Sequence, residues 1–251
     1  MLISRLLLAA VLTVPLAPVT ASNFNACTVK SDYSVERRDG GYRFTRTDGH
    51  AADVHIRDGR LVVDGVDATI SPADRARLRR FQSDLDGVVE QARVLGMEAA
   101  ALAVDAVSEV AIAFFGDDPA TLRRFEARLA TLEKDIRATL PSGDGPLFDE
   151  AAFERAMESA MEELAPMLAG QVAGKAVAAA LSGNQERIRD LEARAKRLEH
   201  EIEASVGRRA KEIEARAEAL CPQIEEMAAT LAALDYRHAD GSRLELVRSR
   251  R

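Results

Sequence analysis

The chain has 251 residues, with 34 Lys and Arg against 41 Asp and Glu, and a formal net charge of −7 at pH 7. This acidic balance argues against nucleic acid as a partner, because phosphate backbones repel a negatively charged protein. Aromatic residues make up 4% of the chain and Trp is absent, which also argues against sites that stack bases or sugars on aromatic rings.

The first 21 residues have the pattern of a secretory signal peptide. A short basic stretch ends at Arg5, an apolar run covers residues 6–14, and small residues occupy 19–21. The apolar run is about half as long as a helix that crosses a bilayer. We therefore predict that residues 1–21 are removed on export. The remaining chain is then a soluble periplasmic protein of a Gram-negative type of bacterium, with membrane contact as a less favoured alternative.

Two cysteines, Cys27 and Cys221, lie near opposite ends of the chain that remains after export. The periplasm is oxidising, and only one intramolecular pairing exists. A redox role is not favoured because the sequence has no C-x-x-C spacing. We predict an intramolecular disulfide between Cys27 and Cys221, with an intermolecular bridge and free thiols as the alternatives.

Residues 22–70 form a predicted β-rich head. Short β-favouring runs alternate with Asp-Gly and Gly-Gly breaks, which indicates a small antiparallel meander. Asp58-Gly59 and Asp64-Gly65 are the strongest hairpin signals, because a two-residue type I′ turn needs positive φ at both positions. The predicted strands cover residues 27–29, 42–45, 53–57, 60–64 and 66–70.

Residues 71–235 form a predicted helical body. Ser71 suits an N-cap and Pro72 the first helical position, while Asp74 is placed to return the capping hydrogen bond. Apolar residues then recur at three-to-four spacing, which predicts a helix that continues until Gly116.

The rest of the body is divided by loop signals. Asp118-Pro119 predicts the start of a second helix that ends near Leu140, and residues 141–146 form the clearest loop. The longest periodic segment, 185–234, is rich in Glu, Lys and Arg and is typical of a coiled-coil helix with a solvent-exposed face. Residues 236–251 are a tail that could add one or two short strands. The predicted fold class is therefore α+β and mostly α, with a small N-terminal antiparallel meander followed by long antiparallel helices.

Histidines suggest two metal hypotheses, and a structural interpretation is favoured for both. His200-Glu201 begins like the zinc-binding H-E-x-x-H helix, but Ala204 stands where the second histidine would be. We interpret this stretch as a solvated helix surface. His50 and His55 would lie on opposite faces of a single strand. The sequence predicts no metal-binding, cofactor-binding or catalytic residue.

Three carboxylates interrupt the apolar run between Val94 and Phe115. Glu98, Asp105 and Glu109 fall on one side of the helical wheel, where paired carboxylates could do acid-base chemistry or bind a cation. The favoured interpretation is that they form the solvent-exposed polar stripe of an amphipathic helix. These charges also make a transmembrane helix costly.

Gly170 and Gly174 form a G-x-x-x-G spacing in a run of small residues. In a membrane such a spacing favours helix dimerisation, but Lys175 lies in the middle of the run. The favoured interpretation is close packing against another helix of the same protein. Membrane insertion and an apolar partner helix are the alternatives.

Several features taken together are similar to one known family. They are the signal peptide, Cys27 soon after it, the hairpin sequence 61–65, the helix start at 71–75 and the late Cys221. This combination resembles the YggN-like family of uncharacterised proteobacterial periplasmic proteins, over most of the mature chain. The resemblance implies location and architecture, and it implies no activity or catalytic residue.

The favoured function is a structural or protein-interaction role in the cell envelope, without enzymatic activity. A long charged helix with small-residue stripes is a surface type used for helix-on-helix recognition. We therefore expect a protein partner, or self-association, through the 185–234 helix. The alternatives are a lipid-binding or membrane-interacting module and a hydrolase with an unrecognised site.

Overall fold

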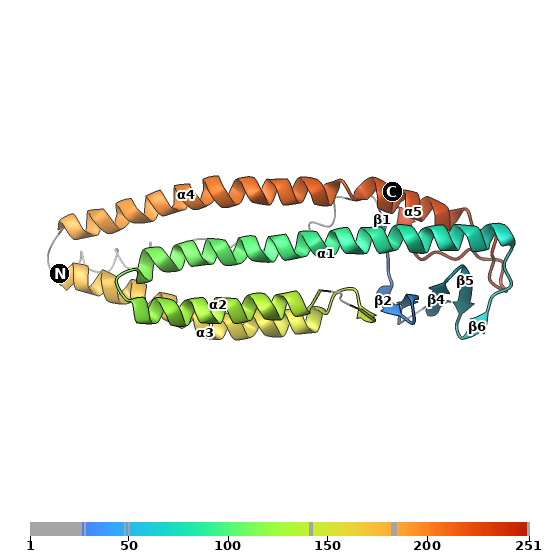
Figure 1. Ribbon diagram of the computed structural model, residues 1–251, viewed down its shortest axis with the longest axis horizontal. Coiled ribbons are helices and arrows are strands. Elements are labelled where there is room, and N and C mark those ends of the chain that lie inside the picture. Colours follow the sequence, from blue (N-terminus) through green and yellow to red (C-terminus); the bar gives the residue numbers. More distant parts are fainter. Residues whose placement is uncertain are drawn as a thin grey trace, which may run out of the picture.

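A small β-sheet at one end of an elongated set of helices makes up the computed structural model of the protein (Figure 1). The structure describes residues 27, 29–47, 49, 51–140, 143–181 and 185–249. The predicted signal peptide lies outside the described residues. Long helices run side by side away from the sheet, which confirms an α+β fold that is mostly α. The boundaries predicted between head, body and tail stay predictions.

The head contains a six-stranded antiparallel sheet with the strand order β6-β5-β4-β3-β2-β7. Asp58 and Gly59 have φ values of 50° and 78°, and Asp64 and Gly65 have 49° and 79°. Both predicted two-residue hairpin turns are therefore confirmed, since each needs positive φ at two consecutive residues. The strands are β2 (Ser34–Arg38), β3 (Gly41–Thr45), β4 (Asp53–Arg57), β5 (Arg60–Val63), β6 (Val66–Asp67) and β7 (Gly145–Pro146).

Two strands of this sheet were not predicted. β2 lies between β3 and β7, although its sequence SVERR has a single apolar residue. β7 lies in the segment that was predicted to be a loop, and it pairs with Glu36 and Arg37 of β2. The predicted strand at 66–70 is shortened to the two residues of β6.

The inner face of the sheet packs against the first half of α1 (Pro72–Phe115). Alternate strand residues point into this core, including Tyr42, Val54 and Ile56, which are at most 1% exposed. α1 contributes Leu78 and Phe81 to the same cluster. This alternation, with every second strand residue buried, fixes the strand register because a one-residue slip would expose the whole apolar set.

Five helices form the body: α1, α2 (Pro119–Ala138), α3 (Glu150–Leu181), α4 (Gln185–Glu218) and α5 (Cys221–Ala232). The predicted Ser71 cap is present, because the Ser71 side chain accepts a hydrogen bond from the Asp74 N–H, and at the predicted start of α2 the Asp118 side chain accepts one from the Thr121 N–H. α1 is the long central helix, with α4 on one side and α2 and α3 on the other (Figure 1). A second core holds the far end together: Ala111, Phe115, Phe125, Leu129, Ala160 and Leu164.

The single helix predicted for 185–234 is wrong, because the structure has two helices there. α4 ends at Glu218, two turn residues follow, and α5 starts at Cys221. Pro222 explains the break. Its ring would collide with the carbonyl of the residue four positions earlier, Glu218, and it has no N–H to donate to that carbonyl.

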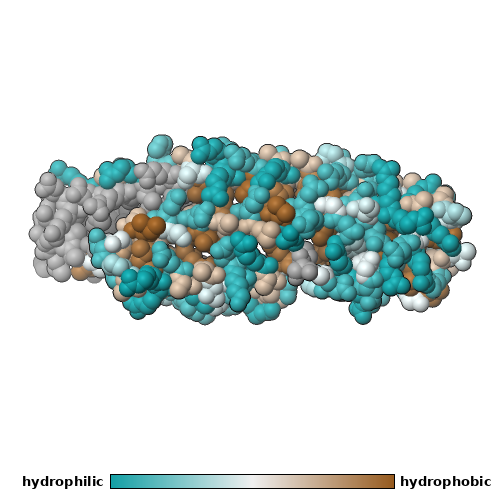
Figure 2. All heavy atoms as spheres, in the orientation of Figure 1, coloured by the Kyte–Doolittle hydropathy of each residue, from teal (hydrophilic) through white to brown (hydrophobic). Residues whose placement is uncertain are grey.

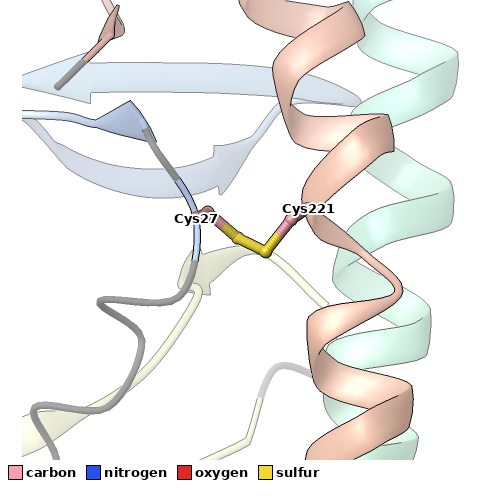
Figure 3. Close-up of a disulfide and its surroundings, with 2 residues drawn as sticks. All are labelled: Cys27 and Cys221. Carbon is pink, nitrogen blue, oxygen red and sulfur yellow. A yellow bond between two sulfur atoms is a disulfide. The ribbon is translucent and has the colours of Figure 1, made fainter. Parts of the chain in front are cut away.

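The two ends of the described chain meet beside the head. Cys27 and Cys221 form a disulfide with their Cα atoms 5.1 Å apart, as predicted (Figure 3). β1 (Val29–Lys30) pairs antiparallel with β8 (Arg248–Ser249) in a separate two-stranded sheet. The tail therefore supplies a strand, but it pairs with β1 and not with the edge of the six-stranded sheet.

A buried carboxylate fixes the chain after α5. The side chain of Asp74 is 1% exposed and accepts hydrogen bonds from the backbone N–H groups of Asp235 and Tyr236 at 3.0 to 3.1 Å. Arg77 donates to it at 2.8 Å. The predicted capping bond from Asp74 back to Ser71 is replaced by these contacts, which join the start of α1 to the end of α5.

Candidate interaction surface

The seam between α1 and α4 is held partly by ion pairs. Glu98 of α1 pairs with Arg216, and Asp105 pairs with Arg209 at 2.9 Å. Two of the three carboxylates predicted to form a solvent-exposed polar stripe therefore pair with α4, whereas Glu109 is exposed. The hydrogen bond from Arg216 holds the pKa of Glu98 below its ordinary value.

Along its described side chains, α4 packs against α1 with one side. Among its described side chains from 203 to 218, none is buried. Val206, Ile213 and Ala217 are half-buried and share a helix face with Arg209 and Arg216, which contact α1. Residues at three-to-four spacing lie on one helix face, so this face is the one that packs on α1.

The opposite side of α4 faces away from α1. Ala204, Arg208, Lys211 and Ala215 follow each other at three-to-four spacing on this side, and all four are exposed. Two long cationic side chains lie here between two alanines, and together they line a shallow hollow with Glu203 and Glu212 at its edges. We call this set of residues, 203, 204, 208, 211, 212 and 215, the outer face of α4.

A second hollow lies between α2 and α3. It is an open groove of about 590 Å³, and Arg128 crosses it by pairing with Ser159 at 2.6 Å and Glu163 at 2.7 Å. Short side chains leave the space unfilled. The lining residues are Thr121, Arg124, Ala127, Arg128 and Thr131 of α2 and Glu163, Pro166, Met167 and Gly170 of α3.

The small-residue run of α3 behaves differently from its prediction. A Cβ added at Gly170 or Gly174 would meet no described atom within 4 Å, so the described residues do not form the close helix packing expected there. Val177, further along the same helix, is 57% exposed. The side chain of Lys175 lies outside the described residues.

Most of the visible surface of the body is hydrophilic, and hydrophobic residues show mainly between the helices (Figure 2). Large hydrophobic side chains that are nonetheless exposed occur on α1 and α3, at Ile112, Met161 and Val177. Within the described part of the chain, no helix is both long and apolar enough to span a membrane.

The histidines are not brought together. His200 and Ala204 are both exposed on α4, and His50 lies outside the described residues. His55 Nε2 is 3.2 Å from the carbonyl oxygen of Arg38 on the outward face of the sheet. Across the residues described, no three His, Cys, Asp or Glu side chains are grouped so that they could hold a metal ion.

One partly buried polar cluster was missed by sequence reasoning. Tyr42 donates to Asp86 at 2.6 Å, and Arg37 donates to both of them. Burial, followed by the hydrogen bond to Asp86, raises the pKa of Tyr42 to about 12. The three residues come from β2, β3 and α1, so no local spacing in the sequence could have revealed their contact.

Residues 27–247 match a protein family described as "Protein of unknown function (DUF2884)". The chain belongs to this family. The match begins at Cys27 and ends in the tail, so it includes both cysteines, the head sheet and all five helices. The search of the curated proteins gave no match, and neither did the search of the solved structures.

The disulfide is the clearest indication of where the family member folds. Stable disulfides form in oxidising compartments outside the cytoplasm and are rare inside it. The pairing of Cys27 with Cys221 therefore points to an oxidising, extracytoplasmic environment.

Proposed function

We propose that the protein is a periplasmic, non-enzymatic protein of the bacterial cell envelope, in which the helical body binds a protein partner or a second copy of the chain. The observation that carries this proposal is the outer face of α4. Over its described side chains from 203 to 218, α4 packs one side against α1 and presents a charged, small-residue surface on the other.

The chemistry of this surface suits another helix. Ala204 and Ala215 allow close approach of a partner backbone, Arg208 and Lys211 lie between them in the same row, and Glu203 and Glu212 offer charges at the edges of the contact. Charged residues that flank a narrow helix seam select partner and orientation in helix pairs. The surface therefore favours a partner helix with small or apolar residues in its seam and acidic residues beside it.

Periplasmic location is supported by the disulfide and by the pattern of residues 1–21, which resembles a signal peptide. An oxidising location also accounts for the disulfide that links the head covalently to the body. An exported protein folds without ATP-dependent help, and a crosslink that closes a long loop favours the folded state.

The test is site-specific photo-crosslinking in the periplasm, combined with light scattering on the purified protein. A photoreactive residue at Lys211 should crosslink to a partner or to a second copy, and the charge reversal Arg208→Glu should reduce that product. The matched control is Ile213 on the same helix, which is half-buried on the face toward α1 and should crosslink within its own chain.

The result that contradicts the proposal is a monomer that gives no intermolecular product from Lys211. If that monomer also carries co-purified lipid, the helices bind an apolar ligand instead. If Ile213 and Lys211 give intermolecular products equally, α4 separates from α1. That result would also refute the outer face of α4 as the binding site.

A further inference from the structure

The outward face of the head sheet carries a row of arginines at one end. Ile56 and Leu61 are buried in the core, so their neighbours Arg57 and Arg60 point away from it. Arg57 and Arg60 are directly opposite each other across the β4–β5 hairpin. Arg38 lies on the same face, two strands away, opposite Gly41 of β3.

The charges in this row are compensated unevenly. Arg60 forms an ion pair with Asp67 at 2.9 Å, and Arg38 is 3.5 Å from Glu36 and 3.8 Å from Asp39. Arg57 donates only to the carbonyl oxygen of Asp39, at 3.4 Å, and within the described part of the chain it has no carboxylate at ion-pair distance. Like charges placed directly opposite in a sheet destabilise it, so the Arg57–Arg60 pair is a cost that an anion would relieve.

A hollow lies between these side chains. It has a volume of about 240 Å³ and is lined by Asp39, His55, Arg57, Arg60 and Val62. A Cβ at Gly41 would come within 2.8 Å of the Arg57 Cβ and 2.3 Å of the Ile56 carbonyl oxygen, so only glycine lets β3 approach β4 this closely. The contact between His55 Nε2 and the Arg38 carbonyl fixes the imidazole at the edge of the hollow.

The two turns beside the hollow are braced by one side chain of α1. Gln82 accepts a hydrogen bond from the Asp58 N–H at 2.9 Å and donates to the Gly40 carbonyl at 3.0 Å. The β2–β3 and β4–β5 turns are therefore tied to the same point of a long helix. Side chains that start from such a fixed frame lose less entropy when they bind a ligand.

We propose that this hollow is a binding site for an oxyanion of the phosphate type, held by Arg57 and Arg60 with His55 beside them. The guanidinium fork matches phosphate oxygens in a bidentate manner, and hydrogen bonds of this charged kind are strong. Asp39 also lines the hollow and Asp67 pairs with Arg60, so Arg57 is the cation of the site that has no carboxylate at ion-pair distance among the described residues. A free phosphate ion and the phosphate of a lipid headgroup offer the same chemistry, and the site does not depend on the proposed helix partner because it lies on the head.

The experiment is a titration of the full oxidised chain with inorganic phosphate at low ionic strength, followed by NMR of backbone amides. We expect saturable shifts of the amides from His55 to Arg60, with chloride at equal ionic strength producing none. Arg57→Gln should weaken the binding about tenfold or more, because it removes a charge-assisted fork. Arg57→Lys should lie between that variant and the wild type, because lysine keeps the charge without the fork.

Arg43→Gln is the matched control. Arg43 lies on the same face and carries the same charge, but it forms two hydrogen bonds with Asp53 at 2.9 and 2.6 Å. Phosphate affinity should therefore be unchanged in this variant. Equal weakening by Arg43→Gln and Arg57→Gln, or the absence of saturable phosphate binding in the wild type, would overturn the site.

Vesicles distinguish the two sources of phosphate. If the ligand is a lipid headgroup, the protein should sediment with phosphatidylglycerol vesicles and not with phosphatidylcholine vesicles, and Arg57→Gln should abolish the difference. If the ligand is a free phosphate, the titration is positive and sedimentation is absent from both. Thermal unfolding of each variant checks that the head is folded, and Arg57→Gln should not lower its stability because it removes the cross-strand repulsion.

Discussion

The contact between Asp74 and the chain after α5 leads to a quantitative prediction. The carboxylate is 1% exposed and accepts from the N–H groups of Asp235 and Tyr236. A hydrogen bond to a charged group contributes about 1.5 to 3 kcal/mol, and a buried donor that loses its acceptor costs a similar amount. Asp74→Ala should therefore lower the free energy of unfolding by about 3 to 6 kcal/mol. Asp74→Asn keeps one acceptor oxygen, so it should cost roughly half as much.

The local consequence is as informative as the global one. Because Asp74 holds residues 235 and 236 from a distance of more than 160 positions in the chain, its loss should free their amides while the rest of α1 stays helical. Hydrogen exchange measured by mass spectrometry on a peptide across 233–237 reads this directly, and urea unfolding gives the free energy.

Ser71→Ala is the control for this prediction, since it removes the cap of the same helix and leaves the Asp74 carboxylate in place. It should cost about 1 kcal/mol and should not change exchange at 235 and 236. The reasoning is refuted if Asp74→Ala costs no more than Ser71→Ala and leaves those two amides as protected as before.

Three further predictions concern the crosslink and two titrating groups. Replacing Cys27 and Cys221 together by Ser should lower the free energy of unfolding by at most about 5 kcal/mol, the loop-entropy estimate, and a urea midpoint equal to that of the oxidised wild type would contradict it. The pKa of Tyr42 is raised from 10.0 to about 12, so the stabilisation that its neutral hydroxyl provides is fully present below pH 10 and is lost, up to a total of about 3 kcal/mol, as pH rises through 12; Tyr42→Phe should lack this fall in denaturant titrations. The pKa of Glu98 is lower in the folded protein than in a free glutamate. Its ion pair with Arg216 therefore stabilises the fold above the ordinary glutamate pKa, and this stabilisation is lost as pH falls through the lowered pKa. Carboxyl NMR should show the pKa of Glu98 returning to its ordinary value in Arg216→Gln, and no change would contradict the pairing.

Local signals in the sequence predicted the parts of the fold that depend on neighbouring residues. Asp58-Gly59 gave a hairpin because positive φ at two positions selects that turn wherever it occurs. Ser71-Pro72 gave the start of α1 because a cap and a proline at the first turn act within a few residues. Such signals need no knowledge of the rest of the chain.

β2 could not be predicted because its reasons for being a strand lie elsewhere. Arg37 points toward α1 and pairs with Asp86 at 2.7 Å, while Glu36 is 3.6 Å from Arg43 of the neighbouring strand. A charged residue, Arg37, therefore fills an inward position opposite the buried Tyr42, where the alternation rule expects an apolar one. Only the partners, which are distant in the sequence, make the pattern understandable.

The break between α4 and α5 was visible in the sequence and was outweighed by periodicity. Ile213, Ala217, Leu220 and Ile224 keep three-to-four spacing across Pro222, because both helices bury the same side against α1. Proline acts on the backbone and leaves this spacing untouched. A periodic pattern therefore shows which side is buried, and it does not show that the helix is continuous.

The candidate surfaces depended least on local sequence. The Arg57–Arg60 pair follows from a hairpin register that could be predicted, but the hollow also needs Gln82 of α1 to brace two turns. The outer face of α4 follows from knowing which side contacts α1, and that is set by the pairing of Arg209 and Arg216 with carboxylates more than 100 positions away.

The position of the disulfide has a mechanical consequence. A pulling force applied at Cys27 and at Ser249 passes through the sulfur bridge into α5 and the tail, because the bridge is the shortest covalent path between those points. Residues 28–220, which include α1 to α4, form a closed loop beside that path, so their covalent backbone is not part of the load path. A force between Cys27 and Ser249 of the oxidised protein therefore does not extend the backbone of α1 to α4, whereas the same load on the reduced chain would pull directly on every helix.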